Sequence, residues 1–169
     1  MRIETERLVI TEFDLSMAKA VHENSLDDDT RRFVPDEVFE TEADAEETIG
    51  FLIGCYTAED GPLVYPVLTK KGENIGYVQL APIDEGWEIG YHIAKKETGK
   101  GYATEAVSAF LPVIAEKKAL SGIYGICLRE NAASLRVMEK CGFKPLYAGT
   151  GEYQGERREI VRCIWRKQQ

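Results

Sequence analysis

The stretch Lys95-Lys96-Glu97-Thr98-Gly99-Lys100-Gly101-Tyr102-Ala103-Thr104-Glu105-Ala106 lies between residues 87–93, a pattern typical of a strand, and residues 103–118, a pattern typical of a helix. Glycines before a helix remove Cβ atoms, and the first-turn N–H groups of any helix have no intrahelical acceptor. The helix dipole adds about half a positive charge at that end, and three lysines add whole charges. The stretch therefore predicts a binding site for a phosphate or pyrophosphate.

Phosphate-binding loops differ in spacing. A P-loop requires a glycine five residues before its Gly-Lys pair and a Ser or Thr after it, whereas this chain has Ala94 and Gly101 there. A dinucleotide fingerprint requires Gly or Ala where the chain has Thr104, and no strand-borne acid follows at the expected distance. A third pattern, Gln/Arg-x-x-Gly-x-Gly/Ala, aligns with Thr98, Gly101 and Ala103. An ordinary glycine-rich turn before a helix remains the alternative.

Two further segments support the third pattern. Residues 131–143, NAASLRVMEKCGF, form an Asn-x-x-Ser segment that closes with Gly-Phe, and residues 4–10, ETERLVI, contain Thr-Glu-Arg-Leu. These three segments, in this order, resemble the signatures of the GCN5-related N-acetyltransferase (GNAT) superfamily, in its ribosomal-protein-alanine acetyltransferase-like (RimJ/RimL-type) branch. The resemblance extends over almost the whole chain.

Composition narrows the class of protein. With 169 residues, 44% of them hydrophobic and 30% charged, the chain is expected to form a single domain, residues 1–169. No apolar run reaches the length of a membrane span and the first residues lack a signal-peptide core, so we expect a cytoplasmic protein without a membrane partner. No Cys-x-x-Cys pair occurs, and we expect no metal and four reduced core cysteines: Cys55, Cys127, Cys141 and Cys163.

Acidic residues outnumber basic ones. The formal net charge of −8 and the pI near 4.9 argue against a nucleic-acid partner, whose phosphates would be repelled. The acids gather between Glu23 and Glu47, where Arg31 and Arg32 are the only opposing arginines. This segment is either a solvated surface or a negative rim that attracts a cationic acceptor, and the sequence leaves both interpretations open.

Hydrophobic periodicity predicts the order of elements. The expected strands are 8–13, 63–69, 75–81, 87–93, 122–128, 143–150 and 160–165; the expected helices are 17–25, one capped by Thr41 and Asp44, 103–118, and one capped by Asn131 and ended by Gly142. The acidic segment around Pro35 is expected to be a loop, and Pro112 conflicts with the helix around it. The prediction is an α+β, GNAT-like fold with a mixed, mostly antiparallel central sheet of about seven strands flanked by four helices. The resemblance adds a splay between the strands that carry Tyr91 and Cys127.

The resemblance also implies a cofactor site for acetyl-CoA. The pyrophosphate would be bound by backbone N–H groups along the glycine loop, and the pantetheine arm would pair with a strand edge and contact the asparagine of the second signature. The implied residues are Gly99, Lys100, Gly101, Tyr102, Ala103 and Thr104 for the pyrophosphate, and Tyr91, His92, Ile93 and Asn131 for the arm. A main-chain amide near His92 would polarise the thioester carbonyl.

Two side chains are the candidate catalytic groups. Glu88 is on the strand that would approach the thioester and is the candidate base, with a purely structural carboxylate as the alternative. Many relatives carry a tyrosine where this chain has Met138, so Ser134 takes the role of proton donor; a hydroxyl bonded back to its own helix is the alternative. His92 is a less favoured base.

The expected activity is transfer of an acetyl group from acetyl-CoA to a primary amine, either a protein N-terminus or a small cationic amine, by direct attack in a ternary complex. Thr98 and Met138 depart from the family pattern, so a non-catalytic acyl-CoA sensor or adaptor is the alternative. A nucleotide-dependent oxidoreductase is a weaker third reading. The oligomeric state, a homodimer included, is left open.

Overall fold

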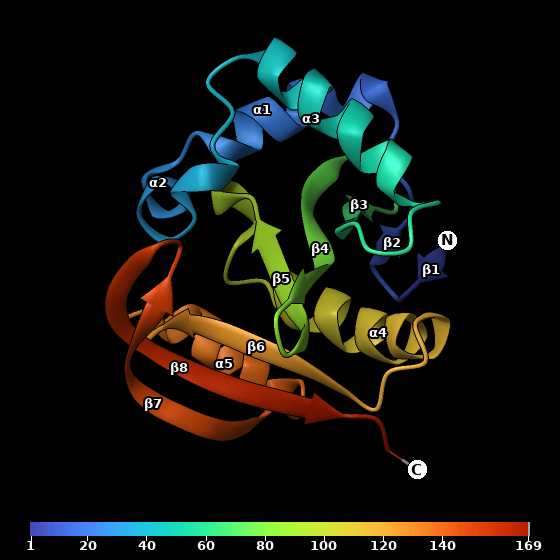
Figure 1. The fold of residues 1–169 in the computed structure, drawn as a ribbon. Helices are drawn as coiled ribbons and strands as arrows, with labels where there is room; N and C mark the ends of the chain where they lie inside the picture. Colours follow the sequence, from blue (N-terminus) through green and yellow to red (C-terminus); the bar gives the residue numbers. More distant parts are fainter. Residues whose placement is uncertain (169) are drawn as a thin grey trace.

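The computed structural model describes residues 1–168, which form one sheet with helices on both faces (Figure 1). The eight strands are β1 (Ile3–Glu4), β2 (Leu8–Ile10), β3 (Leu63–Thr69), β4 (Asn74–Ile83), β5 (Gly86–Ile93), β6 (Gly122–Leu128), β7 (Lys144–Tyr153) and β8 (Glu156–Arg166). The α-helices are α1 (Ala18–Ser25), α2 (Asp28–Phe33), α3 (Glu42–Cys55), α4 (Tyr102–Lys117) and α5 (Ala132–Lys140), and three 3-10 turns are η1 (Leu15–Met17), η2 (Pro35–Glu37) and η3 (Lys95–Glu97).

The sheet has the strand order β1-β2-β3-β4-β5-β6-β8-β7. Every neighbouring pair is antiparallel except β5 and β6, which run parallel and pair only at Glu88 and Tyr124. Beyond that pair the two strands diverge, as Figure 1 shows. The expected α+β class, the antiparallel meander and the splay are therefore confirmed, with eight strands and five helices in place of about seven and four.

The expected loop around Pro35 is wrong, because the acidic segment contains α2 and η2. Asp27 caps α2 by accepting a hydrogen bond from the N–H of Thr30 at 3.0 Å. Two aspartates occupy the first turn of α2 and two arginines its last turn, so both ends complement the helix dipole. The segment that appeared to be a charged loop is a short helix with matched ends.

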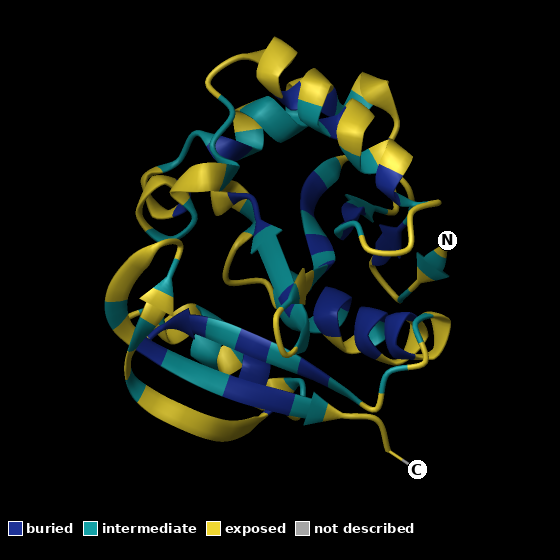
Figure 2. Cartoon of the chain, in the orientation of Figure 1, coloured by how far each residue is buried: buried dark blue, intermediate teal, exposed yellow. Residues whose placement is uncertain are grey.

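Two hydrophobic clusters cover opposite faces of β3. Leu63 and Tyr65 belong to the main core, which also includes the buried side of α4 and residues of α5, whereas Val64 packs with residues of α1 and α3. Successive side chains of a strand point to opposite faces, so α4 and α5 cover one face and α1 and α3 the other. Figure 2 shows the buried side of α4 against the sheet.

Several local predictions are confirmed. Thr41 and Asp44 form a reciprocal capping box at the start of α3. Gly142 ends α5 with φ of +86°, and the N–H groups of Gly142 and Phe143 donate back to the carbonyls of Glu139 and Met138 at 3.1 and 3.0 Å. This arrangement fixes the entry into β7.

Helix α4 continues through Pro112, which is exposed. Proline lacks the N–H that would bond the carbonyl of Ser108, and its ring crowds the preceding turn. We expect Pro112→Ala to increase the free energy of unfolding by about 1 to 2 kcal/mol, since part of the proline cost is offset by its rigidity in the unfolded chain. Urea denaturation would measure the change. Glu116→Ala, on an exposed position of the same helix, is the control, and a Pro112→Ala protein no more stable than wild type would contradict the expectation.

Candidate active site

The glycine loop between η3 and α4 presents unpaired backbone amides. Gly99 and Gly101 have φ of +77° and +83°, and Gly101 is the N-cap of α4 without a side-chain cap. Within the described chain, the N–H groups of residues 99–104 have no protein acceptor. Both conformations favour glycine, and a Cβ at Gly99 would face open space. The predicted anion site therefore has the required geometry.

The amino-terminal signature holds this loop in place. Arg7 donates through Nη1 to the carbonyl of Lys100 at 2.9 Å, pairs through Nη2 with Glu105 at 2.6 Å, and lies 4.5 Å from the ring centre of Tyr102. Thr5 donates to the same carboxylate at 2.6 Å. Burial raises the pKa of Glu105, but these hydrogen bonds outweigh it and hold that pKa below its usual value. The Thr-Glu-Arg-Leu segment thus braces the start of α4.

The lysines contribute less free charge than the sequence suggested. Lys95 pairs with Asp29 of α2, and Lys100 pairs with Glu97 at 2.7 Å. Both pairs are solvent-exposed, where an ion pair contributes little to stability. Lys96 has no ion pair among the described residues, so its charge adds to the backbone amides and the helix dipole as the positive potential at the loop.

A groove of about 200 Å³ leads from this loop to the gap between β5 and β6. Thr98 and Ala103 line one part of it, and Tyr91, Asn131 and Ser134 line another. The N–H of Ala94 donates to the carbonyl of Ile75 at 2.8 Å, across the β4 side of β5. Backbone groups alternate along an antiparallel pair, so those of Tyr91 and Ile93 face the gap instead. A free strand edge is available there.

His92 has a different role from its neighbours in the strand. By the same alternation its own amide faces β4, so the amides of Tyr91 and Ile93 are the ones that face the groove. Its ring stacks on Tyr77, and Nε2 lies 2.8 Å from the hydroxyl of Thr30 in α2. Burial lowers the pKa of His92, while Asp27 raises it in part. The side chain joins α2 to the sheet.

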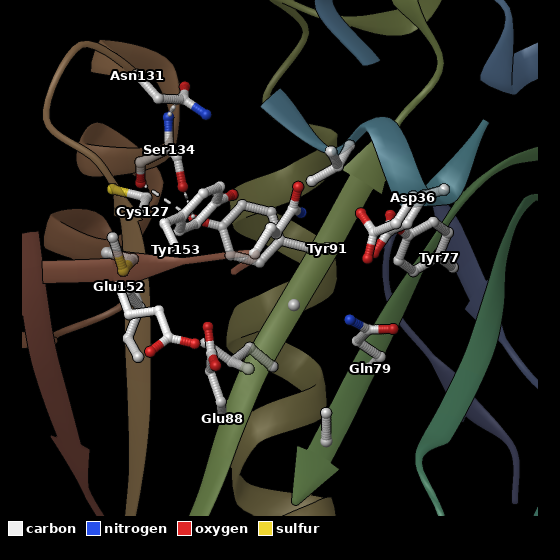
Figure 3. Close-up of a pocket in the computed structure, with 18 residues that line it drawn as sticks. Asp36, Tyr77, Gln79, Glu88, Tyr91, Cys127, Asn131, Ser134, Glu152 and Tyr153 are labelled. Carbon is white, nitrogen blue, oxygen red and sulfur yellow. Dashed lines mark hydrogen bonds between the residues drawn. The ribbon is translucent and has the colours of Figure 1, made fainter. Parts of the chain in front are cut away.

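A pocket of about 280 Å³ adjoins the groove and shares Tyr91, Asn131 and Ser134 with it (Figure 3). The hydroxyl of Tyr91 lies 2.8 Å from that of Ser134, so the serine hydroxyl is not bonded back into its own helix. Asn131 caps α5 by accepting from the N–H of Ser134 at 3.1 Å. Met138 is buried, lines the same pocket and cannot donate a proton. The sequence predicted Tyr91 as a cofactor-binding residue but not the contact of its hydroxyl with Ser134, because that contact across the gap depends on tertiary structure.

Glu88 lines the pocket from β5. Burial raises the pKa of its carboxyl to about 7, although Arg162 and the amide of Ile126 act in the opposite direction. A carboxyl with this pKa exchanges a proton near neutral pH, as a general base requires. Because it contacts the Ile126 amide, Glu88 also helps to join β5 to β6 at the point where the two strands separate. The catalytic and structural interpretations of Glu88 are therefore compatible.

Four further residues line the pocket: Asp36, Glu37, Glu152 and Tyr153. The first two belong to the acidic segment between Glu23 and Glu47, for which a negative rim facing a cationic acceptor was one interpretation, whereas the sequence indicated no role for the other two. Asp36 and Glu37 are in η2, within the segment expected to be a loop, and the other two are at the end of β7. Burial, followed by the nearby Asp36 carboxylate, raises the pKa of Glu37 to about 8. Its Oε2 atom is buried and has no hydrogen-bond partner in the described chain.

Other expectations concern metals, cysteines and membranes. Over residues 1–168 no group of three or more His, Cys, Asp or Glu side chains is placed to hold a metal ion. All four cysteines are free thiols; three are buried, and Cys141 is partly buried beside Ser108. No helix in this part of the chain combines the length and apolar character needed to cross a bilayer.

Glu37 should make stability depend on pH. Its folded-state pKa of about 8 lies above the ordinary 4.5, so the unfolded chain releases this proton first and stability declines as pH rises from about 4.5 to 8. We expect Glu37→Gln to raise the melting temperature by several degrees at pH 8 and by little at pH 5. Thermal unfolding at both values tests this, with exposed Glu47→Gln as control. An equal increase in melting temperature at pH 5 and pH 8 would contradict this expectation.

Comparisons with known proteins agree with this geometry. Residues 7–144 match the family model described as an acetyltransferase (GNAT) domain. A curated relative, the uncharacterized N-acetyltransferase YnaD of Bacillus subtilis (strain 168), is 32% identical over 147 residues, or 85% of this chain and 83% of the relative. A GNAT-family acetyltransferase from Bacillus anthracis superposes with a TM-score of 0.83 at 29% identity, over 98% of each chain. RimL, a ribosomal L7/L12 alpha-N-protein acetyltransferase solved with coenzyme A, has the same TM-score at 18% identity, again over 98% of each chain, and shows a common fold.

Proposed function

The chain belongs to the GNAT acetyltransferase family and is an acetyl-CoA-dependent N-acetyltransferase, and we propose that it acetylates a primary amine by direct attack in a ternary complex. One observation carries the proposal: a groove from the glycine loop and a separate pocket meet at Tyr91, Asn131 and Ser134. The groove suits the cofactor and the pocket suits the amine. Both substrates can therefore be bound at once, with their reactive ends at the junction.

The residues present fit acetyl-CoA. The free amides of residues 99–104 suit its pyrophosphate, and the free edge of β5 at Tyr91 and Ile93 suits an extended, amide-bearing arm. Asn131 uses its Oδ1 as the helix cap, which leaves its amide nitrogen for the same arm. Bound acetyl-CoA supplies an acetyl group activated as a thioester. Thr98 has no guanidinium or amide, so the backbone provides most of the phosphate contacts.

Three side chains that line the pocket have distinct roles in this proposal. Glu88 accepts the proton that the amine must lose, since amines with pKa near 8 to 10 are mostly protonated at neutral pH. Ser134 provides a proton for the leaving sulfur, and the Tyr91 hydroxyl orients Ser134 through their 2.8 Å hydrogen bond. An amide on the free edge of β5 polarises the carbonyl. The acceptor is either a small cationic amine or a protein N-terminus, the substrate class named for RimL.

Release of free thiol from acetyl-CoA in the presence of primary amines tests this function directly. We expect kcat/KM to increase with pH through an apparent pKa of about 7, because Glu88 must be deprotonated to act as the base. Glu88→Gln should lower kcat by about 10² or more and remove this limb of the pH profile. Arg162→Met should move the limb to higher pH, since it removes the cation that lowers the pKa of Glu88.

The same assay separates the alternatives. Coenzyme A binding without thiol release for any amine would favour the sensor or adaptor. An unchanged pH profile in Glu88→Gln would instead leave the activity in place and remove Glu88 as its base.

The glycine loop can be tested with a matched pair of substitutions. Gly101→Glu should abolish coenzyme A binding in calorimetry, because it adds bulk and negative charge where the amides face the phosphates. Gly72 has almost the same φ, +85° against +83°, and lies in an exposed turn between β3 and β4. Gly72→Glu therefore imposes the same backbone strain away from the groove and should retain binding. Equal affinities for the two variants would remove the loop assignment.

A further inference from the structure

The pocket of about 280 Å³ that we assign to the amine has charged residues of one sign only. Its charged lining residues are all acids, Asp36 and Glu37 from η2, Glu88 from β5 and Glu152 from β7, and no Lys, Arg or His among the described residues lines it. Asp36 and Glu152 are exposed at the rim, whereas Glu37 and Glu88 are partly buried. Figure 3 shows the carboxyl groups of Glu88 and Glu152 on one side of the pocket and that of Asp36 on the other. Acids on separate elements thus face one small cavity.

Glu37 is the second observation that points to a ligand. A buried carboxyl oxygen ordinarily has a hydrogen-bond donor, and the Oε2 atom of Glu37 has none. The hydroxyl of Ser25, which lines a neighbouring cavity with Glu37, donates to the carbonyls of His22 and Phe39 instead. The aromatic rings of Tyr77 and Tyr153 line the same pocket. Carboxylate oxygens beside aromatic faces suit an ammonium group.

A single amino group cannot balance the negative charge of this pocket. The attacking nitrogen and Glu88 form a neutral pair both before and after the proton passes between them, so this nitrogen leaves no charge to balance the other carboxylates. We propose that the acceptor is a small diamine or polyamine, whose reactive nitrogen lies at Glu88 and whose second ammonium group is bound by Glu37 and Asp36 on the opposite side. This inference rests on the proposed acetyltransferase activity and specifies its substrate.

The size of the pocket agrees with a small acceptor. Its volume of about 280 Å³ is at the lower end of the range for small-molecule sites. The hydroxyl of Tyr153 donates to the carbonyl of Phe33 at 2.9 Å, which joins the end of β7 to α2. These are the elements next to the outer acids Glu152 and Asp36. The walls of the pocket are therefore held together around a compact ligand.

Four-carbon amines that differ only at the far end test the proposal. The series is 1,4-diaminobutane, 1-aminobutane, 4-amino-1-butanol and 4-aminobutanoate, compared by kcat/KM for thiol release. We expect the diamine to exceed the monoamine and the amino alcohol by about tenfold or more, mainly through KM, and the carboxylate to be poorest. Diamines of three to six carbons should show an optimum length.

Glu37→Gln tests the anchor. We expect it to reduce the ratio of diamine to monoamine kcat/KM by about tenfold, because it removes the charge but keeps the shape. Glu40→Gln makes the same charge change in the same acidic segment, but Glu40 pairs with Arg31 outside the pocket, so this variant should keep the ratio within about twofold. A purely structural role for Glu37 would change both substrates equally and leave the ratio intact.

The outcomes separate the two proposals. The inference is overturned if acceptors with a neutral far end react as well as those with a cationic one, or if a peptide N-terminus is preferred to every diamine. The proposed acetyltransferase activity stands in either case. Absence of thiol release with every amine, while coenzyme A still binds, overturns the proposed function itself.

Discussion

The site depends on one break in the sheet: β5 and β6 are parallel and pair only at Glu88 and Tyr124. Where two parallel strands part, the chain leaves each carboxyl end to start a helix, α4 after β5 and α5 after β6. Ligands bind at such switch points because helix N-termini and unpaired strand edges converge there. The loop amides, the free edge of β5 and the cap of α5 all follow from this break, and so does the junction of groove and pocket.

A gap in a sheet is costly unless other contacts hold its borders. On one side, Arg7 and Thr5 converge on Glu105, which links the amino-terminal strands to the first turn of α4. On the other side, the Tyr91 hydroxyl reaches from β5 to Ser134 of α5 across the gap. His92 and Thr30 connect the end of β5 to α2. The borders are thus joined by side-chain hydrogen bonds where backbone pairing is lost, so the amides at the loop and edge stay free.

The sequence predicted those features that are local or that recur at fixed spacing. The meander, the helix caps at Thr41 and Asn131, the reversal at Gly142 and the glycine loop follow from periodicity and turn chemistry. The short helix α2 was missed because charge density suggested solvent exposure, although Asp27 and the paired arginines are helix-end signals. The Tyr91–Ser134 contact could not be predicted, since it joins residues 43 positions apart. Glu88 and the acidic segment were candidates from the sequence, but their meeting with Glu152 in one pocket depends on the tertiary structure.

The acids of the pocket link chemistry to stability. Burial raises the pKa of Glu88 to about 7 and that of Glu37 to about 8, and in both cases the folded protein favours the protonated form that the unfolded chain lacks at neutral pH. A core replacement of either acid by an apolar residue would relieve this cost, so the carboxyl groups are not explained by stability. A positively charged ligand relieves it differently, because it stabilises the ionised form that a base or an anchor must adopt. The same desolvation that lowers the stability of the folded protein therefore makes the pocket carboxylates respond to an ammonium group.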